Sequence, residues 1–239
     1  MSPRRAAAPL AVLAALAVLV TAAPALPELQ PPGRAALVAA LPPLLLLAAL
    51  AALLADRVRT TPGVAALVAV GAVLTVLTTA LDARGAGTVA EVLLAIGLGL
   101  AFARVFDLGA FVLGLPLVLG TIDAATTLTS SVIRTWPQPL PPGDPLVLEL
   151  PSWSAQTAAG QLSIATVLFL AALQASAVRE RLRPWGACAG MAAGLVAAYV
   201  LEWATDRAMP ATAFVAAGFL LGVADRLPAW WRAGGLERG

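Results

Sequence analysis

The chain has 239 residues, of which 60% are hydrophobic and 12% are charged, and its formal net charge is +2 at pH 7. So few charged side chains cannot cover a water-soluble globule of this size, which excludes an ordinary soluble domain and indicates a chain surrounded mostly by lipid. With no His and a single Cys, Cys188, the sequence lacks the residues for an intrachain disulfide or a zinc site of the usual ligands, and we expect no metal and no cofactor.

Apolar runs follow one another along the whole chain. A helix needs about 20 mainly apolar residues to cross the hydrocarbon layer of a bilayer. The breaks between the runs are short, and they are polar or contain Pro or Gly. The pattern predicts an all-α, polytopic transmembrane helical bundle of about eight spans. The predicted spans are residues 9–26, 35–55, 62–81, 88–106, 109–133, 156–178, 185–205 and 210–226.

The first of these runs has a second interpretation. Arg4, Arg5, the apolar core from Leu10 to Val20 and the segment Ala23-Pro24-Ala25 also fit a cleavable secretory signal. We favour a membrane span, because a Pro inside a small-x-small site disfavours cleavage and the apolar run continues to Leu26. Cleavage would leave seven spans and would not change the rest of the topology.

The arginines predict the orientation. With the amino terminus inside, eleven Arg residues fall on the inner side and four on the outer side, as the positive-inside rule requires, and all six Trp residues fall near span ends. We therefore expect both termini in the cytoplasm (N-in, C-in). The outer four are Arg34, Arg84, Arg134 and Arg207. Composition rich in Ala, Leu, Val, Arg and Gly, with no Lys, is typical of a GC-rich bacterial genome, so we expect a multi-pass protein of the bacterial plasma membrane.

A glycine repeat marks the seventh span. Gly186, Gly190 and Gly194 recur every four residues, which is a pattern that lets a neighbouring helix approach closely. We favour packing within the chain over a dimer contact, and the oligomeric state is left open. The bilayer is the expected partner, together with transmembrane segments of other proteins, and we expect no binding of nucleic acid.

Asp123 lies near the centre of the fifth span. An ionised carboxylate is costly at that depth, and such a residue calls for a functional hypothesis. On a helical wheel Asp123 shares one face with three hydroxyl side chains, those of Thr126, Thr127 and Ser130. A structural role is equally open, in which a protonated Asp123 is hydrogen-bonded to hydroxyls and holds helices together.

The sixth span carries a second polar stripe, formed by Gln156, Ser163, Thr166 and Gln174. Because consecutive spans run in opposite directions, Thr166 is expected at nearly the same depth as Asp123. We predict that the two stripes face each other around a wet cleft open to the outside.

A Pro-rich segment joins the fifth and sixth spans. Residues 136–145 contain five Pro residues and should form a stiff, extended connector on the outer side. Residues 147–150 alternate between apolar and other side chains, which predicts a short strand just before the sixth span.

The last four spans resemble the carboxy-terminal half of the presenilin and signal peptide peptidase clan of intramembrane aspartyl proteases. Members of that clan carry Tyr-Asp, then GxGD, and a final helix that opens with Pro-Ala-Leu. Here the corresponding segments are Ile122-Asp123, then Ser163-Ile164-Ala165-Thr166 followed by Val167-Leu168-Phe169, and Pro210-Ala211-Thr212. The resemblance covers residues 109–226. It implies an amino-terminal four-helix scaffold (residues 1–106) and a carboxy-terminal four-helix presenilin-like half (residues 107–239).

The resemblance also implies which residues form the site. Asp123 corresponds to the first aspartate, and the substrate-binding positions correspond to Ser163 and to Pro210, Ala211 and Thr212. Thr166, however, occupies the place of the second aspartate, and an aspartyl protease needs two carboxylates that share one proton. We therefore expect a catalytically silent relative, a pseudoprotease that binds or holds other proteins.

Two other functions stay open. Asp123 would also serve a small-solute or proton-coupled transporter as its ion site, or the chain is a purely structural membrane subunit. The sequence has no HExxH pair, no GxSxG elbow and no phosphate-binding loop, which argues against metalloprotease, hydrolase-fold and nucleotide-driven functions.

Overall fold

The computed structural model describes residues 3–27, 32–81, 83–106, 109–129, 146–151, 153 and 158–237, and these residues form a bundle of helices with one small β-hairpin. The α-helices are α1 (Pro3–Ala22), α2 (Pro32–Arg57), α3 (Thr61–Ala80), α4 (Arg84–Val105), α5 (Phe111–Thr129), α6 (Ile164–Arg179), α7 (Pro184–Thr205), α8 (Ala211–Val223) and α9 (Leu227–Arg232). The strands are β1 (Val147–Pro151) and β2 (Ala158–Ser163), and two 3₁₀ turns are η1 (Ala23–Ala25) and η2 (Gly235–Glu237).

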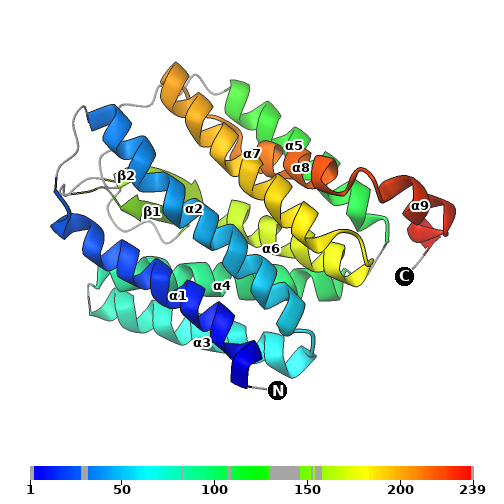
Figure 1. The fold of residues 1–239 in the computed structure, drawn as a ribbon, viewed down its shortest axis with the longest axis horizontal. Coiled ribbons are helices and arrows are strands. Elements are labelled where there is room, and N and C mark those ends of the chain that lie inside the picture. The colour runs from blue at the N-terminus through cyan, green and yellow to red at the C-terminus, as the bar shows by residue number, and fades with distance from the viewer. Residues whose placement is uncertain are drawn as a thin grey trace.

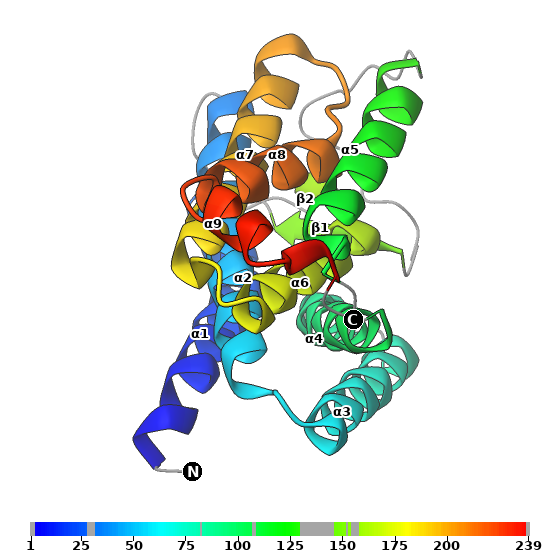
Figure 2. The ribbon, with the colours of Figure 1, turned by 90° about the vertical axis from the view of Figure 1, so that its right-hand side faces the viewer.

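The predicted all-α bundle is confirmed at the level of its main helices. Five of them, α2, α3, α4, α5 and α7, are long and apolar enough to cross a membrane, and the apolar segments of α1, α6 and α8 are shorter. Figures 1 and 2 show α3 beside α4 along one edge of the bundle, and α5 with α7 and α8 along the opposite edge. Helices α6, with 16 residues, and α8, with 13, are therefore shorter than a straight crossing needs, whereas α1 has 20 residues.

The predicted sixth span, residues 156–178, is wrong in its first part. Residues Ala158–Ser163 form β2, which pairs antiparallel with β1 in the register Leu148↔Leu162 and Glu149↔Gln161. The helix begins only at Ile164. The sequence of this segment, AAGQLS, fits a strand as well as a helix, and the partner strand decides between them by supplying hydrogen bonds to the backbone. The short strand predicted at residues 147–150 is confirmed as β1.

The hairpin lies inside the bundle near the start of α6 (Figure 1), and its apolar side chains Leu148, Leu150, Ala159 and Leu162 are buried. It contacts α2 and α4 as well as α6. Non-helical backbone at membrane depth is tolerated only where protein or water satisfies its polar groups. Helices α2, α4 and α6 pack against this hairpin, and the Pro-rich connector at residues 136–145 lies outside the described residues.

Helices α7 and α8 pack through glycines on both sides of their contact. A Cβ atom added at Gly190 would overlap the carbonyl oxygen of Gly218, and one at Gly186 would overlap that of Gly222. Gly194 meets the backbone of Phe214 in the same way. The glycine repeat of the seventh span therefore serves packing within the chain, as predicted.

The amino-terminal and carboxy-terminal halves are in extensive contact. Helix α2 packs against α6 and α7, and α4 packs against α6. The α4–α6 contact is close, because a Cβ atom at Gly99 would overlap the backbone carbonyl of Leu168. The carboxy-terminal helices therefore lie directly against the amino-terminal ones, with α2 and α4 forming the contact.

Candidate functional site

Asp123 lies on the face of α5 that packs against α8. One turn earlier, Gly120 allows α8 to approach, since a Cβ atom there would lie 3.2 Å from the Cβ of Ala216. The side chain of Asp123 is half-buried. Its position on α5 directs the carboxylate toward the first turn of α8 rather than toward α6.

The carboxylate of Asp123 accepts hydrogen bonds from the start of α8. Its Oδ2 accepts from the backbone N–H groups of Thr212, at 2.8 Å, and Ala213, at 3.1 Å, and its Oδ1 accepts a long hydrogen bond from Thr127 Oγ1 at 3.4 Å. The residue preceding α8 is Pro210, whose side chain provides no acceptor for the unpaired N–H groups of the first turn. Asp123 therefore caps the amino terminus of α8 from a neighbouring helix. Its negative charge also lies at the positive end of the α8 dipole, where it is favourable.

Thr166 joins the same cluster from α6. It lies in the first turn of that helix, is 3% exposed, and its Oγ1 lies 3.1 Å from Thr212 Oγ1. Thr212 thus contacts Asp123 through its backbone and Thr166 through its hydroxyl. The structure brings together Asp123, Thr166 and the segment Pro210–Thr212, and Thr212 links them.

Ser163 has a local role at the junction of β2 and α6. It is the N-cap residue of α6, and its Oγ accepts a hydrogen bond from Ala165 N at 3.2 Å. The side chain is exposed beside the buried hairpin. Its position is therefore compatible with a contact to another molecule, while its hydrogen bond explains where α6 begins.

The prediction that two polar stripes face each other is wrong. Gln174 is buried and donates to the carbonyl oxygen of Pro184 on α7, and Thr126 is exposed and donates to Ile122 O of its own helix. Gln156 and Ser130 lie outside the described residues. The helical wheel failed for the sixth span because Ser163 belongs to a strand. What meets between α5, α6 and α8 is the cluster of Asp123, Thr166 and Thr212.

Tyr199 is a buried polar residue that the sequence reasoning missed. From α7 it donates a hydrogen bond to the carbonyl oxygen of Ala159 in β2, and its hydroxyl also lies 3.4 Å from Ala36 O in α2. It is the only Tyr of the chain, and a lone phenol within an apolar span is a signal for such an anchor. Tyr199 therefore ties the hairpin to α7.

In the part of the chain that the structure describes, no group of three or more His, Cys, Asp or Glu side chains is arranged to hold a metal ion. Helix α6, which supplies Thr166, contains no Asp or Glu. Among the described residues, the site therefore offers the carboxylate of Asp123, the hydroxyls of Thr127, Thr166 and Thr212, and the backbone N–H groups at the start of α8.

We compared the chain with protein-family models, with curated proteins and with solved structures, and none of them matches.

Proposed function

We propose that this chain is a catalytically silent membrane protein that binds or holds other membrane proteins, on a scaffold related to that of the intramembrane aspartyl proteases. The observation that carries the proposal is the engagement of Asp123 with the backbone of α8. A catalytic aspartate must face its partner carboxylate and a water molecule. Asp123 instead faces two N–H groups, and the neighbouring polar side chain from α6 is the hydroxyl of Thr166.

The proposed binding region is the hairpin together with Ser163 and the segment Pro210–Thr212. Members of the presenilin and signal peptide peptidase clan hold substrate in front of the helix that corresponds to α6. An extended segment of a partner would add to such a hairpin through main-chain hydrogen bonds. We propose that this chain binds its partners there and does not cleave them.

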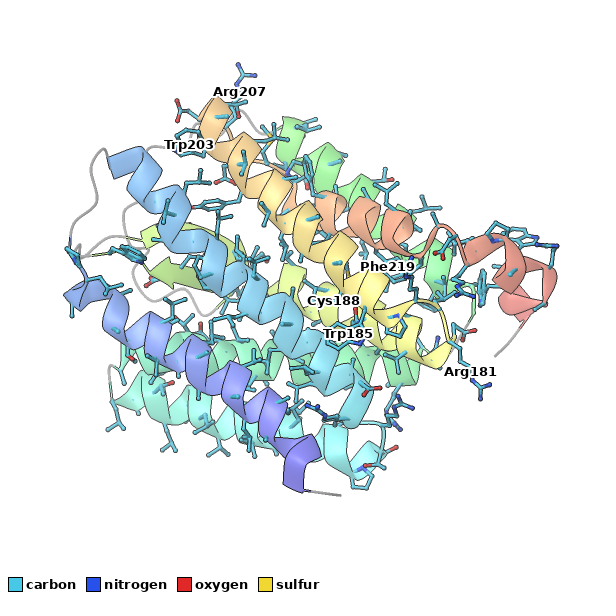
Figure 3. The ribbon with its side chains drawn as sticks, in the orientation of Figure 1. Arg181, Trp185, Cys188, Trp203, Arg207 and Phe219 are labelled. Carbon is cyan, nitrogen blue, oxygen red and sulfur yellow. The ribbon has the colours of Figure 1, made fainter. Side chains whose placement is uncertain are left out.

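We further propose the finer topology, with about eight crossings, both termini in the cytoplasm, and a bacterial plasma membrane. Three observations support it. Consecutive helices from α1 to α8 run in opposite directions across the bundle, the three shorter apolar ones included (Figure 1). Arg181 and Arg207 lie at opposite ends of the bundle, and Trp185 and Trp203 lie at opposite ends of α7 (Figure 3). Strand β2 runs directly into α6, so that the two together cover more depth than the helix alone.

A cleavage assay tests the silent assignment. The full-length protein in lipid vesicles is incubated with labelled transmembrane peptides, beside the variants Asp123→Asn and Thr166→Asp. We expect no cleavage by the unmodified protein or by Asp123→Asn. Cleavage by Thr166→Asp would show that only the second acid is missing. Cleavage by the unmodified protein that disappears in Asp123→Asn would refute the proposal.

A transporter is the second candidate, because α8 has 13 residues and begins inside the bundle at Asp123. Many transporters use such half-helix starts as ion or substrate sites. Here the N–H groups of that start donate to Asp123, so a transported cation would compete with them for the same oxygen. Proton or solute uptake into vesicles that is lost in Asp123→Asn would favour this function over the binding scaffold.

A further inference from the structure

A cavity of ≈ 870 Å³ lies among the ends of five helices, away from the Asp123 cluster. Its walls come from the end of α2, the start of α3, the ends of α4 and α6, the start of α7, and the loops that follow α2 and α6. None of the lining residues belongs to α5 or α8. The cavity is therefore a second feature of the molecule, independent of the proposed function except that it assumes a chain embedded in a bilayer.

Four arginines and one aspartate line this cavity: Arg59, Arg104, Arg179, Arg181 and Asp56. These residues come from segments far apart in the sequence, and the fold gathers them at one end of the bundle. Arg181 lies at that end in Figure 3. The charged side chains of the lining are thus strongly biased toward positive charge.

Much of this positive charge is left for a ligand. Arg59 pairs with Asp56, and Arg179 pairs with Glu180 at 3.2 Å. The described partner of Arg104, in contrast, is a neutral hydroxyl, Thr61 Oγ1 at 2.8 Å.

Arg181 shows no hydrogen-bond or ion-pair partner for its guanidinium among the described residues. It also has φ 51°, a backbone conformation that side chains other than Asn, Asp and Gly adopt rarely. An arginine therefore stands at the end of α6 where a glycine would fit the backbone better.

The deeper wall of the cavity is apolar. Leu100 lies one turn before Arg104 on α4, and Ala175 lies one turn before Arg179 on α6, and both line the cavity. A ligand that fills this space meets hydrocarbon on one side and guanidinium groups on the other. A phospholipid has that combination, whereas a free phosphate ion does not.

We propose that this cavity binds the phosphate of an anionic phospholipid head group, with the acyl chains lying against its apolar wall. Guanidinium groups bind phosphate oxygens through paired, charge-assisted hydrogen bonds. Basic pockets between transmembrane helices are known positions for anionic lipid head groups. Arg104 and Arg181 supply the binding charge, because no carboxylate neutralises either of them among the described residues.

Native mass spectrometry of the purified full-length chain in detergent tests the proposal, with phosphatidylglycerol or phosphatidylcholine added. We expect tighter binding of phosphatidylglycerol. Arg104→Gln and Arg181→Gln should each weaken it about fivefold, which corresponds to ~1 kcal/mol for one arginine near a membrane surface. Phosphatidylcholine binding should change little in either variant.

Two matched control variants each remove one arginine that does not line the cavity. Arg232→Gln lies at the same end of the bundle on α9, where the arginine donates to Pro228 O at 3.1 Å, and Arg207→Gln lies at the opposite end (Figures 1 and 3). Both should leave phosphatidylglycerol binding unchanged. The thermal unfolding of Arg181→Gln without added lipid should match that of the unmodified protein, because its side chain has no described partner to lose.

Three outcomes would overturn the proposal. One is equal binding of phosphatidylglycerol and phosphatidylcholine. Another is a loss in Arg232→Gln as large as that in Arg181→Gln, which would mean attraction to the whole basic surface. The third is inorganic phosphate binding as tightly as the lipid, which would identify a soluble phosphate as the ligand.

Discussion

The carboxylate of Asp123 on α5 accepts hydrogen bonds from two backbone N–H groups in the first turn of α8. The need arises from Pro210, which precedes α8 and has no side-chain oxygen to cap the helix. Inside a membrane bundle no bulk water replaces such a partner. At the scale of the single residue, capping of α8 therefore explains why a carboxylate is present at position 123. The carboxylate lies at this depth in the bundle because α8 begins there.

Removing this cap should destabilise the protein. We predict that Asp123→Ala lowers the free energy of unfolding by about 1–3 kcal/mol, since two half-buried N–H groups lose their acceptor. Asp123→Asn should cost less, because an amide oxygen still accepts. Thermal unfolding in detergent measures both.

The control for this experiment is Thr121→Ala on the same helix. Thr121 is exposed and its hydroxyl donates only to Leu117 O, so we expect a change within about 0.5 kcal/mol. If Asp123→Ala were as mild as Thr121→Ala, the capping role would be wrong.

The hydroxyl pair of Thr166 and Thr212 should show a small coupling. We predict an interaction energy of about 0.5–1 kcal/mol in a double-mutant cycle with Thr166→Val and Thr212→Val, as is usual for hydrogen bonds between membrane helices. The stability of the four proteins in detergent gives this value. Additive effects of the two substitutions would show that the hydroxyls do not interact.

Among the helices, the α7–α8 pair depends most on backbone contact. Gly190 and Gly218 face each other with no room for a side chain on either. We predict that Gly190→Ala lowers the free energy of unfolding by about 1–3 kcal/mol or more, because the two helices must move apart.

Gly114 on α5 is the matched control, because a Cβ atom there would meet nothing within 4 Å. In Gly114→Ala only the helix propensity changes, so we expect a gain of about 0.5–1 kcal/mol. Chemical or thermal unfolding in detergent should therefore move in opposite directions for the two Gly→Ala variants. A gain in both would contradict the close packing of α7 on α8.

The hairpin is the other element whose support is specific. Tyr199 ties β2 to α7 by donating to Ala159 O. We predict that Tyr199→Phe leaves this buried carbonyl without its phenol partner, costs about 1–3 kcal/mol, and raises deuterium uptake of residues 158–163 in hydrogen exchange. Unchanged uptake there would mean that the strand pairing alone holds the hairpin.

The elements differ in how well the sequence predicts them. Helices α2, α3, α4 and α7 follow the predicted spans within a few residues, since each run is long, apolar and bounded by turn residues. Strand β1 was found by its alternation. Strand β2 was not, because Ala158–Ser163 leads directly into the apolar run of α6, and pairing with β1, which no local pattern encodes, decides its conformation.

For the candidate site too, the sequence predicts one part and not another. Asp123, Thr166 and Pro210–Thr212 were all selected from the sequence, by depth in the span or by the resemblance. The hydrogen bonds that join Asp123 to α8 were not predicted, because their donors are backbone N–H groups, and those are present in every residue except Pro. The sequence therefore identifies the members of the cluster, and only the fold reveals what Asp123 does.

At the scale of the whole molecule, the two sites depend on one orientation. The arginine-lined cavity belongs to the inner leaflet, and the hairpin belongs to the outer half of the bundle, only if Arg181 faces the cytoplasm and Arg207 faces outward. Arg181 and Arg207 lie at opposite ends of the bundle (Figure 3), which makes them suitable positions to report the two faces. The membrane topology is therefore the central claim, because the depth of Asp123 and the leaflet of the cavity both follow from it.

Cysteine labelling in intact cells tests this claim most directly. The chain has one native cysteine, the buried Cys188, so a Cys188→Ala background permits single reporters at Arg181→Cys and Arg207→Cys. We predict that a membrane-impermeant thiol reagent labels Arg207→Cys in intact cells and labels Arg181→Cys only after the membrane is permeabilised. Labelling of Arg181→Cys in intact cells, or equal labelling of both, would contradict the topology.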